Sequence, residues 1–529
     1  MKKVFLALAT LGFVACAEND EMGKQPIQDG EKEQSYMAVS LLADDMSTRA
    51  AGDEYEDGEA AERVVKSLYF FLFDAQGNAF DVDGGKNYKS VAVDESGDDP
   101  TGSAPDGTPN VSDVKKKVLV FENYKGEYPA KIVAVINWTP TATSYDLDAL
   151  AGQMIALKNA DDAFVMSNAV YAAESTNASA NKEAILATPL TEANIAKTEA
   201  DALDNPVKIY VERIAAKVTV DTTAENKYPV GEEVNGETVY AKVLGWELYN
   251  EFDKSYLLKN IDASWTDAAV GFSWNDSAWF RSYWAISPVA NFDATNKVSY
   301  DTLSNGVATS DYCGENTYNA DCTKVVVKAQ LIKENGDAIE IATWYGQDYI
   351  GEAALRTVVA NTLASQLYYL DGVEYKSITA DDIKVVEANE TNPNTTAQMK
   401  AYHVFFQLSD AGAVKTWYTY STVEGFKTVT SDDINVILGG VEPALLYKGG
   451  QTYYHTNIKH LPSTVDATQY GVVRNHVYKV NINSITGFGT PVYDGTTEFD
   501  PETPEDITTY VSAEVRILSW RVVEHDYDI

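Results

Sequence analysis

Alternating apolar and polar residues recur along most of the chain and predict short β-strands. Residues 64–73, 118–121 and 131–138 are β-prone runs, and the last is apolar enough to be buried on both faces. Residues 206–220, 240–250, 325–332, 402–408 and 472–485 have similar composition, with turns rich in Gly, Asp and Asn between them. Residues 144–157 have helical spacing and predict a short helix beside a sheet. Repeated strands with little helix predict an all-β protein built from β-sandwiches.

The stretch 36–49 has the pattern of a half-buried strand followed by a protease target. Met37, Val39 and Leu41 alternate with small or polar residues, and Arg49 is the only basic residue between residues 33 and 62. The small residues Ala50, Ala51 and Gly52 follow it, which favours exposure. Two interpretations fit: an ordinary first strand with an acidic linker, or a strand that an Arg-specific protease removes by cutting between Arg49 and Ala50.

The first residues have the features of an export signal. Lys2 and Lys3 precede an apolar run over residues 4–15, which is shorter than the roughly twenty residues that span a bilayer. The run ends at Cys16 in a sequence that resembles a lipobox, with Phe13 in place of the usual Leu. We therefore expect residues 1–15 to be a lipoprotein signal peptide and Cys16 to be acylated. A plain secretory signal with Cys16 inside the apolar run is the alternative.

Composition shifts divide the rest of the chain. Residues 81–110 are loop-like, and residues 172–205 are a low-complexity stretch rich in Ala, Asn, Glu and Thr. We expect residues 16–49 to be a propeptide with a removable strand. A first sandwich is then expected over 50–206, and a second over 207–529.

The net charge narrows the classes of partner. The chain has 41 Lys and Arg against 79 Asp and Glu, a formal charge of -38. A surface this acidic repels phosphate backbones and anionic lipids, so we expect no nucleic-acid partner. After the export signal, no segment is apolar and long enough to predict a membrane span.

Known catalytic and metal-binding motifs are not found in the sequence. It has no nucleotide loop, dinucleotide-binding glycine pattern, nucleophile elbow or His-Glu-x-x-His, and only 5 His. We predict no enzyme activity, catalytic residue, cofactor or metal site. The acidic stretches 81–85 and 94–99 do not have EF-hand spacing, and solvated loops or calcium ligands both fit them. Cys313 and Cys322 are compatible with a disulfide in an oxidising compartment or with two structural thiols.

Several motifs, taken in order, resemble the fimbrillins of the type V pilus, and most closely the structural subunit of the minor fimbria. Besides Cys16 and Arg49-Ala50, they lie at residues 211–218, 245–250, 283–288, 312–317, 447–450 and 487–491. The most specific is Tyr470-Gly471-Val472-Val473-Arg474-Asn475-His476-Val477-Tyr478. The resemblance covers nearly the whole chain and is weakest over 81–110 and 172–205.

The resemblance implies a fold and an assembly route. It implies two transthyretin-like Greek-key β-sandwiches with short helices and long loops. It further implies export as an outer-membrane lipoprotein, cleavage after Arg49 by an Arg-specific protease, and polymerisation by strand exchange into a cell-surface fimbria. The expected partners are other copies of the chain and accessory tip and anchor subunits, and the expected roles are adhesion and biofilm formation.

The carboxyl-terminal pattern fits a strand that is given to a neighbour. Val511, Ala513, Val515 and Ile517 alternate, and the register then changes. The donor expected from the resemblance comprises Leu518, Trp520, Val522, Val523, His525, Tyr527 and Ile529.

The alternative function is a monomeric surface lipoprotein, or a pilus tip or anchor adhesin, that binds glycans or host proteins.

Overall fold

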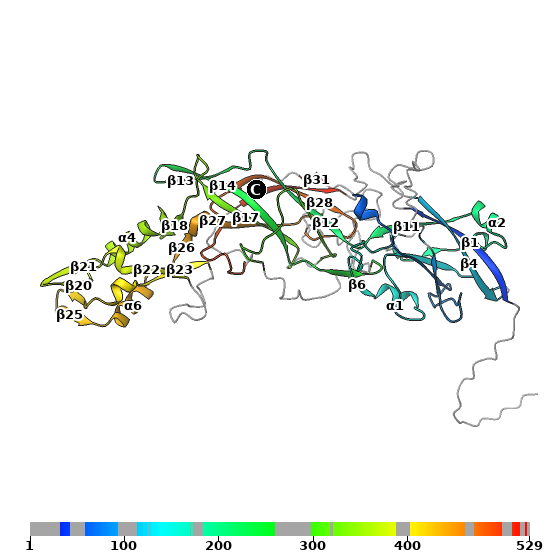
Figure 1. Cartoon of the computed structure of the whole chain (residues 1–529), viewed down its shortest axis with the longest axis horizontal. Helices are drawn as coiled ribbons and strands as arrows, with labels where there is room; N and C mark the ends of the chain where they lie inside the picture. The colour runs from blue at the N-terminus through cyan, green and yellow to red at the C-terminus, as the bar shows by residue number, and fades with distance from the viewer. Residues whose placement is uncertain are drawn as a thin grey trace, which may run out of the picture.

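The chain folds into an elongated all-β molecule with three groups of sheets (Figure 1). The structure is a computed structural model. It describes residues 32–42, 59–91, 93, 114–124, 126–169, 171–172, 184–259, 298–317, 321–387, 402–460, 470–499, 510–518 and 524–525. The first sheet lies at one end, a pair of sheets lies in the middle, and a lobe that contains helices lies at the other end. The predicted all-β class and sandwich arrangement are confirmed.

The first sheet has the strand order β3-β2-β5-β7-β11-β1-β4, and β10 pairs with β5. The strands are β1 (Lys32–Leu42), β2 (Leu68–Phe73), β3 (Tyr88–Val91), β4 (Val114–Tyr124), β5 (Lys131–Ile136), β7 (Met166–Asn168), β10 (Thr188–Pro189) and β11 (Val207–Arg213). Alternate residues of β2 enter two different cores, with Phe70 on one face and Phe71 on the other. β5 is likewise buried on both faces, as its sequence predicted. The sheet is therefore packed on both sides.

The middle of the molecule is a sandwich of two five-stranded sheets, β16-β12-β28-β30-β31 and β13-β14-β17-β27-β29. The first contains β12 (Ala216–Thr222), β16 (Ser310–Cys313), β28 (Val477–Thr486), β30 (Tyr510–Leu518) and β31 (Glu524–His525). The second contains β13 (Tyr228–Val234), β14 (Glu237–Tyr249), β17 (Lys324–Ile332), β27 (Gln451–Asn457) and β29 (Thr490–Pro491). Alternate side chains from both sheets, such as Val218, Val480 and Val327, meet in one core. This is the period-2 burial that the strand patterns predicted.

A lobe that was not predicted as a separate unit is inserted between β17 and β27. Its sheets are β19-β18-β26-β23-β22 and β21-β20-β24-β25. The strands are β18 (Ile341–Trp344), β19 (Gln347–Ile350), β20 (Leu367–Asp371), β21 (Glu374–Ser377), β22 (Ile383–Glu387), β23 (His403–Leu408), β24 (Trp417–Ser421), β25 (Gly425–Val429) and β26 (Ala444–Tyr447). α4 (Gly351–Leu363), α5 (Asp410–Ala413) and α6 (Ser431–Gly439) accompany them. Leu355, Val359 and Leu363 of α4 fall on one helical face and enter the core of the lobe.

Smaller elements complete the described chain. They are α1 (Leu147–Ala151), α2 (Glu199–Asp204), the pairs β6 (Met154–Ala156) with β15 (Lys254–Tyr256) and β8 (Tyr171–Ala172) with β9 (Ala184–Ile185), and the 3-10 turns η1 (Ala60–Arg63), η2 (Glu192–Asn194), η3 (Ala380–Asp382) and η4 (Lys448–Gly450). The helix expected over 144–157 is thus shorter. Asp146 caps its first turn, Gly152 follows its last residue, and the chain continues into β6.

The change from the first sheet to the sandwich occurs later than the sequence suggested. The second sandwich was expected to start at residue 207, but β11 pairs with β7 and β1 in the first sheet. The sandwich begins with β12 at Ala216. Both strands are apolar and separated by two residues, so composition alone does not reveal that they belong to different sheets. Among the described residues, no helix has the length and apolar character needed to cross a membrane.

Candidate functional site

The first strand of the chain is inserted between two strands that come later. All eleven residues of β1 pair antiparallel with β4, and Val39–Leu42 pair parallel with residues 207–210 of β11. Among the described strands, β4 pairs with β1 alone. Removing β1 would therefore expose one unpaired strand edge on β4 and another on β11, with a gap one strand wide between them.

The side chains of β1 form part of the first core. Met37, Ala38 and Val39 are 0% exposed, and Met37 and Val39 pack with Leu119 and Phe121 of β4. The alternation of Met37 and Val39 was predicted, but the burial of Ala38 on the opposite face was not. The centre of β1 is therefore buried on both faces, because it lies between two strands in a sheet with apolar cover on each side.

Polar contacts fix the register of β1. Ser35 Oγ donates to Asn123 Oδ1 at 2.6 Å, and both residues are buried. Tyr36 exchanges backbone hydrogen bonds with Ala196, at 2.9 and 2.8 Å. These contacts oppose a slip of one residue, which would turn Met37 and Val39 away from the core.

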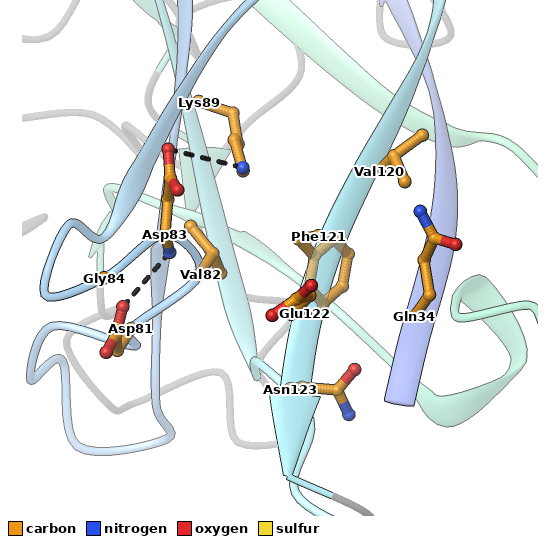
Figure 2. Close-up of a pocket in the computed structure, with 10 residues that line it drawn as sticks. All are labelled: Gln34, Asp81, Val82, Asp83, Gly84, Lys89, Val120, Phe121, Glu122 and Asn123. Atoms are coloured by element: carbon orange, nitrogen blue, oxygen red, sulfur yellow. Dashed lines mark hydrogen bonds and ion pairs between the residues drawn. The ribbon is translucent and has the colours of Figure 1, made fainter. Parts of the chain in front are cut away.

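A polar pocket with a volume of about 340 Å³ lies at the amino-terminal end of β1 (Figure 2). Gln34 of β1 and residues 120–123 of β4 line one side, and the turn with Asp81 and Asp83 lines the other. Asp83 pairs with Lys89 at 3.4 Å, and Asp81 Oδ1 accepts from the backbone N–H of Asp83 at 3.1 Å. Asp81 therefore serves its own turn, and Asp83 pairs with the neighbouring strand β3. No cluster of metal-binding side chains occurs among the described residues, and the acidic stretch 94–99 lies outside them.

Buried charges hold the connection after β1 at the junction between the first sheet and the sandwich. Glu62 of η1 is 1% exposed, and its Oε1 accepts from Lys217 Nζ at 2.7 Å and from the Tyr312 hydroxyl at 2.5 Å. Burial acts to raise the pKa of Glu62, but these hydrogen bonds outweigh it and hold the pKa below its usual range. Burial and the hydrogen bond to Glu62 raise the pKa of Tyr312. Glu62 therefore stays ionised and Tyr312 stays protonated.

The most specific sequence motif, 470–478, builds the second half of this junction. Arg474 is fully buried, and its Nε donates to Glu315 Oε2 at 2.7 Å. Asn475 lies in the left-handed region, with φ 58°, and its Oδ1 accepts from the backbone N–H of Arg213 at 3.2 Å. The backbone N–H of Lys217 donates to the backbone carbonyl of His476 at 2.9 Å. The motif thus joins the start of β28 to the link between β11 and β12.

The second motif, 487–491, is also structural. Gly489 has a φ of 78°, and a Cβ at this position would lie 2.8 Å from the carbonyl oxygen of Tyr453. The hydroxyls of Tyr447 and Tyr454 donate to the carbonyls of Gly489 and Gly487, each at 3.0 Å. Glycine is needed here because the turn passes directly over a neighbouring backbone.

Many of the predicted processing and donor residues lie outside the described residues: Cys16, Arg49, Ala50, Trp520, Val522, Val523, Tyr527 and Ile529. Of the remaining two, Leu518 is the last residue of β30 and His525 lies in β31. β30 pairs with β28 along its length, and β31 turns back onto β30 through Val515↔His525 and Arg516↔Glu524. Residues 510–518 therefore belong to the sandwich of their own chain.

Cys313 and Cys322 are free, buried thiols in the structure, not a disulfide. Burial raises the pKa of Cys322 to about 11 and the pKa of Cys313 well above its ordinary value. Both are therefore protonated at neutral pH, which leaves little of the reactive thiolate.

The last part of the chain, residues 445–526, matches the family model described as "Major fimbrial subunit protein type IV, Fimbrillin, C-terminal". This range contains both structural motifs and the strands from β27 to β31. The resemblance to the fimbrillins is confirmed over this carboxyl-terminal segment. The match covers this carboxyl-terminal segment, and no curated protein matches the chain.

Several solved structures are weakly similar. A fimbrilin from Porphyromonas gingivalis is 14% identical with a TM-score of 0.36, covering 92% of this chain and 98% of its own. A C-terminally truncated tip fimbrial protein from the same organism is 13% identical with a TM-score of 0.26, covering 91% of this chain and 100% of its own. A fimbrial assembly protein from Parabacteroides distasonis is 10% identical with a TM-score of 0.27, covering 75% and 100%.

The sequence reasoning missed the junction charges. Lys217 and Tyr312 both fall within motifs that were recognised, but Glu62 does not. The local signal was weak: Glu62 is an acidic residue next to Arg63, two positions before the apolar pair Val64-Val65 that leads toward β2.

Proposed function

We propose that this chain is the structural subunit of a cell-surface fimbria, closest to that of the minor fimbria, and that it polymerises by strand exchange. The observation that carries the proposal is the place of β1, which fills a gap between β4 and β11 although it comes first in the chain. Because β1 precedes all the other described strands in the chain, it can be cut off without breaking the chain between any two of them, and its departure opens the gap between β4 and β11. The family match of residues 445–526 supports the same function.

Cleavage after Arg49 is the proposed trigger. It would separate β1 covalently from the rest of the first sheet, and β1 would then be held by its backbone pairing and apolar contacts alone. A strand from another copy that restores this pairing could take its place, as in donor-strand complementation. Burying about five apolar side chains of the donor, at roughly 1.5–3 kcal/mol each, would contribute on the order of 8–15 kcal/mol before ordering costs.

The carboxyl-terminal segment that follows Leu518 is the proposed donor. β30 itself is held in the sandwich, so a donor has to begin where that pairing ends, at Leu518. The two-residue strand β31 has to release Val515 and Arg516 before residues 519–529 can extend toward a neighbour. That pairing is short, so releasing it costs little compared with what the donor gains in a groove.

The proposal places the chain at the cell surface. Acylation at Cys16 would anchor the unprocessed precursor in the outer membrane, and cleavage would release the subunit from this anchor for assembly. Its partners would be further copies of the same chain, accessory tip and anchor subunits, and an Arg-specific protease. Adhesion and biofilm formation would follow from the finished fibre.

The amino terminus of the assembled protein tests the proposal directly. Fibres sheared from cells should consist of subunits that begin at Ala50, as read by mass spectrometry of the intact chain. Polymerised material that begins at Cys16 would contradict the role of β1 as a removable strand.

A second candidate, an adhesin at the tip or in the anchor, is favoured by the surface of the lobe. Nine of the thirteen large apolar residues that are exposed in the described chain lie there: Tyr345, Leu370, Val373, Tyr375, Val414, Tyr420, Val423, Phe426 and Val436. Exposed aromatic and apolar clusters commonly mark binding surfaces for other molecules. If this candidate is correct, immunogold labelling will find the chain at fibre ends and not along the shaft.

A further inference from the structure

Arg63 is the next arginine after Arg49 and is the competing target for the same protease. It is the last residue of η1, which lies between β1 and β2 in the chain. Cleavage at either arginine would separate β1 from β2, so the protease specificity alone does not choose between the two sites.

The residue before Arg63 is held by the sandwich. The Glu62 carboxylate accepts from Lys217 Nζ at 2.7 Å and from Tyr312 at 2.5 Å, and the Glu62 carbonyl accepts from Arg213 Nε at 2.8 Å. Glu62 is 1% exposed and Lys217 is 5% exposed. Lifting this segment into a protease would separate a buried ion pair and strand the Lys217 ammonium, which is strongly unfavourable.

The residues after Arg63 are held by Asn137. Asn137 Oδ1 accepts from the backbone N–H of Lys66 at 2.7 Å, and its Nδ2 donates to the carbonyl of Val64 at 2.7 Å. The backbone N–H of Asn137 donates to the backbone carbonyl of Ser67 at 3.0 Å. Arg63 therefore lies between two anchors, and the Nε of its side chain is itself buried. Proteases bind several residues on each side of the cut in extended form, which requires this segment to open locally.

We propose that Glu62 and Asn137 determine which arginine is cut, by holding Arg63 against the junction so that β1 is released at Arg49. The inference rests on the proposed function, in which cleavage after Arg49 starts assembly. It adds residues that determine the specificity of that cleavage through the fold: Asn137 is far from both arginines in the sequence, and Glu62 acts through its contacts with Lys217 and Tyr312.

The consequence of a wrong cut explains why such protection matters. Cleavage after Arg63 would detach Glu59 and Glu62 from the chain, and these are the two carboxylates that pair with Lys217 in the described part of the structure. Lys217 would remain buried at the junction without them. The processed subunit would then carry an unpaired charge where the first sheet meets the sandwich.

The same anchor makes protection depend on the sandwich. Lys217 lies in β12 and Tyr312 lies in β16, which are neighbouring strands of one sandwich sheet. The Glu62 anchor on Arg63 is therefore complete only while this sheet is folded and docked on the first, whereas the Asn137 contacts lie within the first sheet. In a subunit whose carboxyl-terminal part is not yet folded, only the Asn137 anchor would remain, and cleavage after Arg63 should be faster than in the folded subunit.

The test is limited digestion of the purified precursor with an arginine-specific endoprotease, with new amino termini followed over time by mass spectrometry. The wild type should yield Ala50 and no Val64. Lys217→Met leaves the sequence around Arg63 unchanged and should raise the rate of cleavage after Arg63 at least about tenfold. Glu62→Ala combined with Asn137→Gly should raise it further. Glycine is chosen because residue 137 has a φ of 62°.

A matched control is Lys227→Met, which removes a different ion pair, between Lys227 Nζ and Glu334 Oε1 at 2.9 Å. Lys227 immediately precedes β13, in the sandwich sheet that does not contain β12 or β16. This control should leave the cleavage pattern unchanged. If Lys217→Met fails to fold, Tyr312→Phe keeps the ring and removes only the hydroxyl bond to Glu62, and it should show a smaller rise.

The outcomes separate this inference from the proposed function. A wild-type precursor that is not cut after Arg49 contradicts the processing step itself. If Arg49 is cut but folded Lys217→Met, Tyr312→Phe and Glu62→Ala/Asn137→Gly proteins show no cleavage after Arg63, the anchors do not select the site. The inference is then wrong while the proposed processing stands.

Discussion

At the scale of single residues, buried charge is concentrated where the first sheet meets the sandwich. Glu212 of β11 is buried beside Lys259, Arg474 and Glu315, and its Oε1 has no hydrogen-bond partner among the described residues. Burial raises the pKa of Glu212 to about 7, although Lys259 and Arg474 act against the rise. Burial also lowers the pKa of Lys259. The junction thus contains a carboxyl group that titrates near neutral pH.

The shift of Glu212 gives the stability of the junction a definite pH dependence. Between pH 4.5, the ordinary value, and about 7, the folded chain keeps a proton that the unfolded chain has lost. The free energy of unfolding should therefore fall as the pH rises through this window. Above it, Glu212 is ionised in both states, and the destabilisation that its buried charge causes should no longer change with pH. Glu212→Gln should match the wild type near pH 4.5 and exceed it at pH 8 by up to about 3 kcal/mol.

Urea unfolding of both proteins at several pH values measures this difference. The variant should show a flatter profile between pH 4.5 and 7, while the two profiles should run parallel above pH 8. Equal slopes for the variant and the wild type across the window would show that Glu212 is ionised in the folded protein.

The two cysteines give a second prediction at this scale. Because Cys313 and Cys322 are buried with raised pKa values, iodoacetamide at pH 8 should label neither in a folded subunit that begins at Ala50 and so lacks Cys16, and both after unfolding. Mass spectrometry of the intact chain counts the added groups. Two thiols that stay unlabelled in urea until a reductant is added would show a disulfide instead.

Residue-scale partners could not be predicted from the sequence. Glu62 lies 155 residues from Lys217 and 250 from Tyr312. The chain has 79 acidic and 41 basic residues, so its composition does not indicate which basic residue pairs with Glu62. Only the fold brings these three together.

At the scale of elements, β1 was predictable because its signal is local. Met37 and Val39 alternate over a single strand, and a period of two residues is sufficient to indicate one. The same reasoning missed α4, whose residues Val358, Val359 and Thr362 are β-branched and therefore favour strands. Their helical conformation depends on Leu355, Val359 and Leu363 packing into the core of the lobe, which is a tertiary effect.

The removable strand predicts a defect that processing should erase. Val39→Asp would bury a carboxylate beside Leu119 and Phe121, so it should destabilise the first sheet of the precursor by at least about 3 kcal/mol. Gln34→Asp, on the exposed end of the same strand, is the matched control and should have little effect. After cleavage and exchange, neither change is present in the subunit.

Thermal unfolding of the precursor and of the processed protein from each variant measures this effect. The Val39→Asp precursor should melt earlier than the control, while the processed proteins should melt together. A processed Val39→Asp protein that stays less stable would mean that β1 is retained.

At the scale of the whole molecule, the acceptor and the donor are features of different parts of one elongated chain. The β1 position lies in the first sheet at one end, and β30 lies in the sandwich (Figure 1). Because the two surfaces differ, contacts between copies would be head-to-tail, and such contacts form open fibres unless their rotation closes a ring.

Strand periodicity predicted the sandwiches, but no local pattern predicted that residues 333–450 would fold as a lobe between two paired strands.

Removing one half of the proposed strand–groove pair at a time tests the polymer at both ends. Arg49→Ala should keep β1 in place and give folded monomers with a donor but no open groove. Deleting residues 523–529 should give monomers that are cleaved normally and fold, since β30 stays in its own sheet, but that lack most of the donor. Mixed with wild type, each should shorten fibres, because Arg49→Ala subunits end a chain at the acceptor side and truncated subunits end it at the donor side. Electron microscopy of the mixtures measures fibre length, and long, boiling-resistant fibres from either variant alone would show that these segments do not join the subunits.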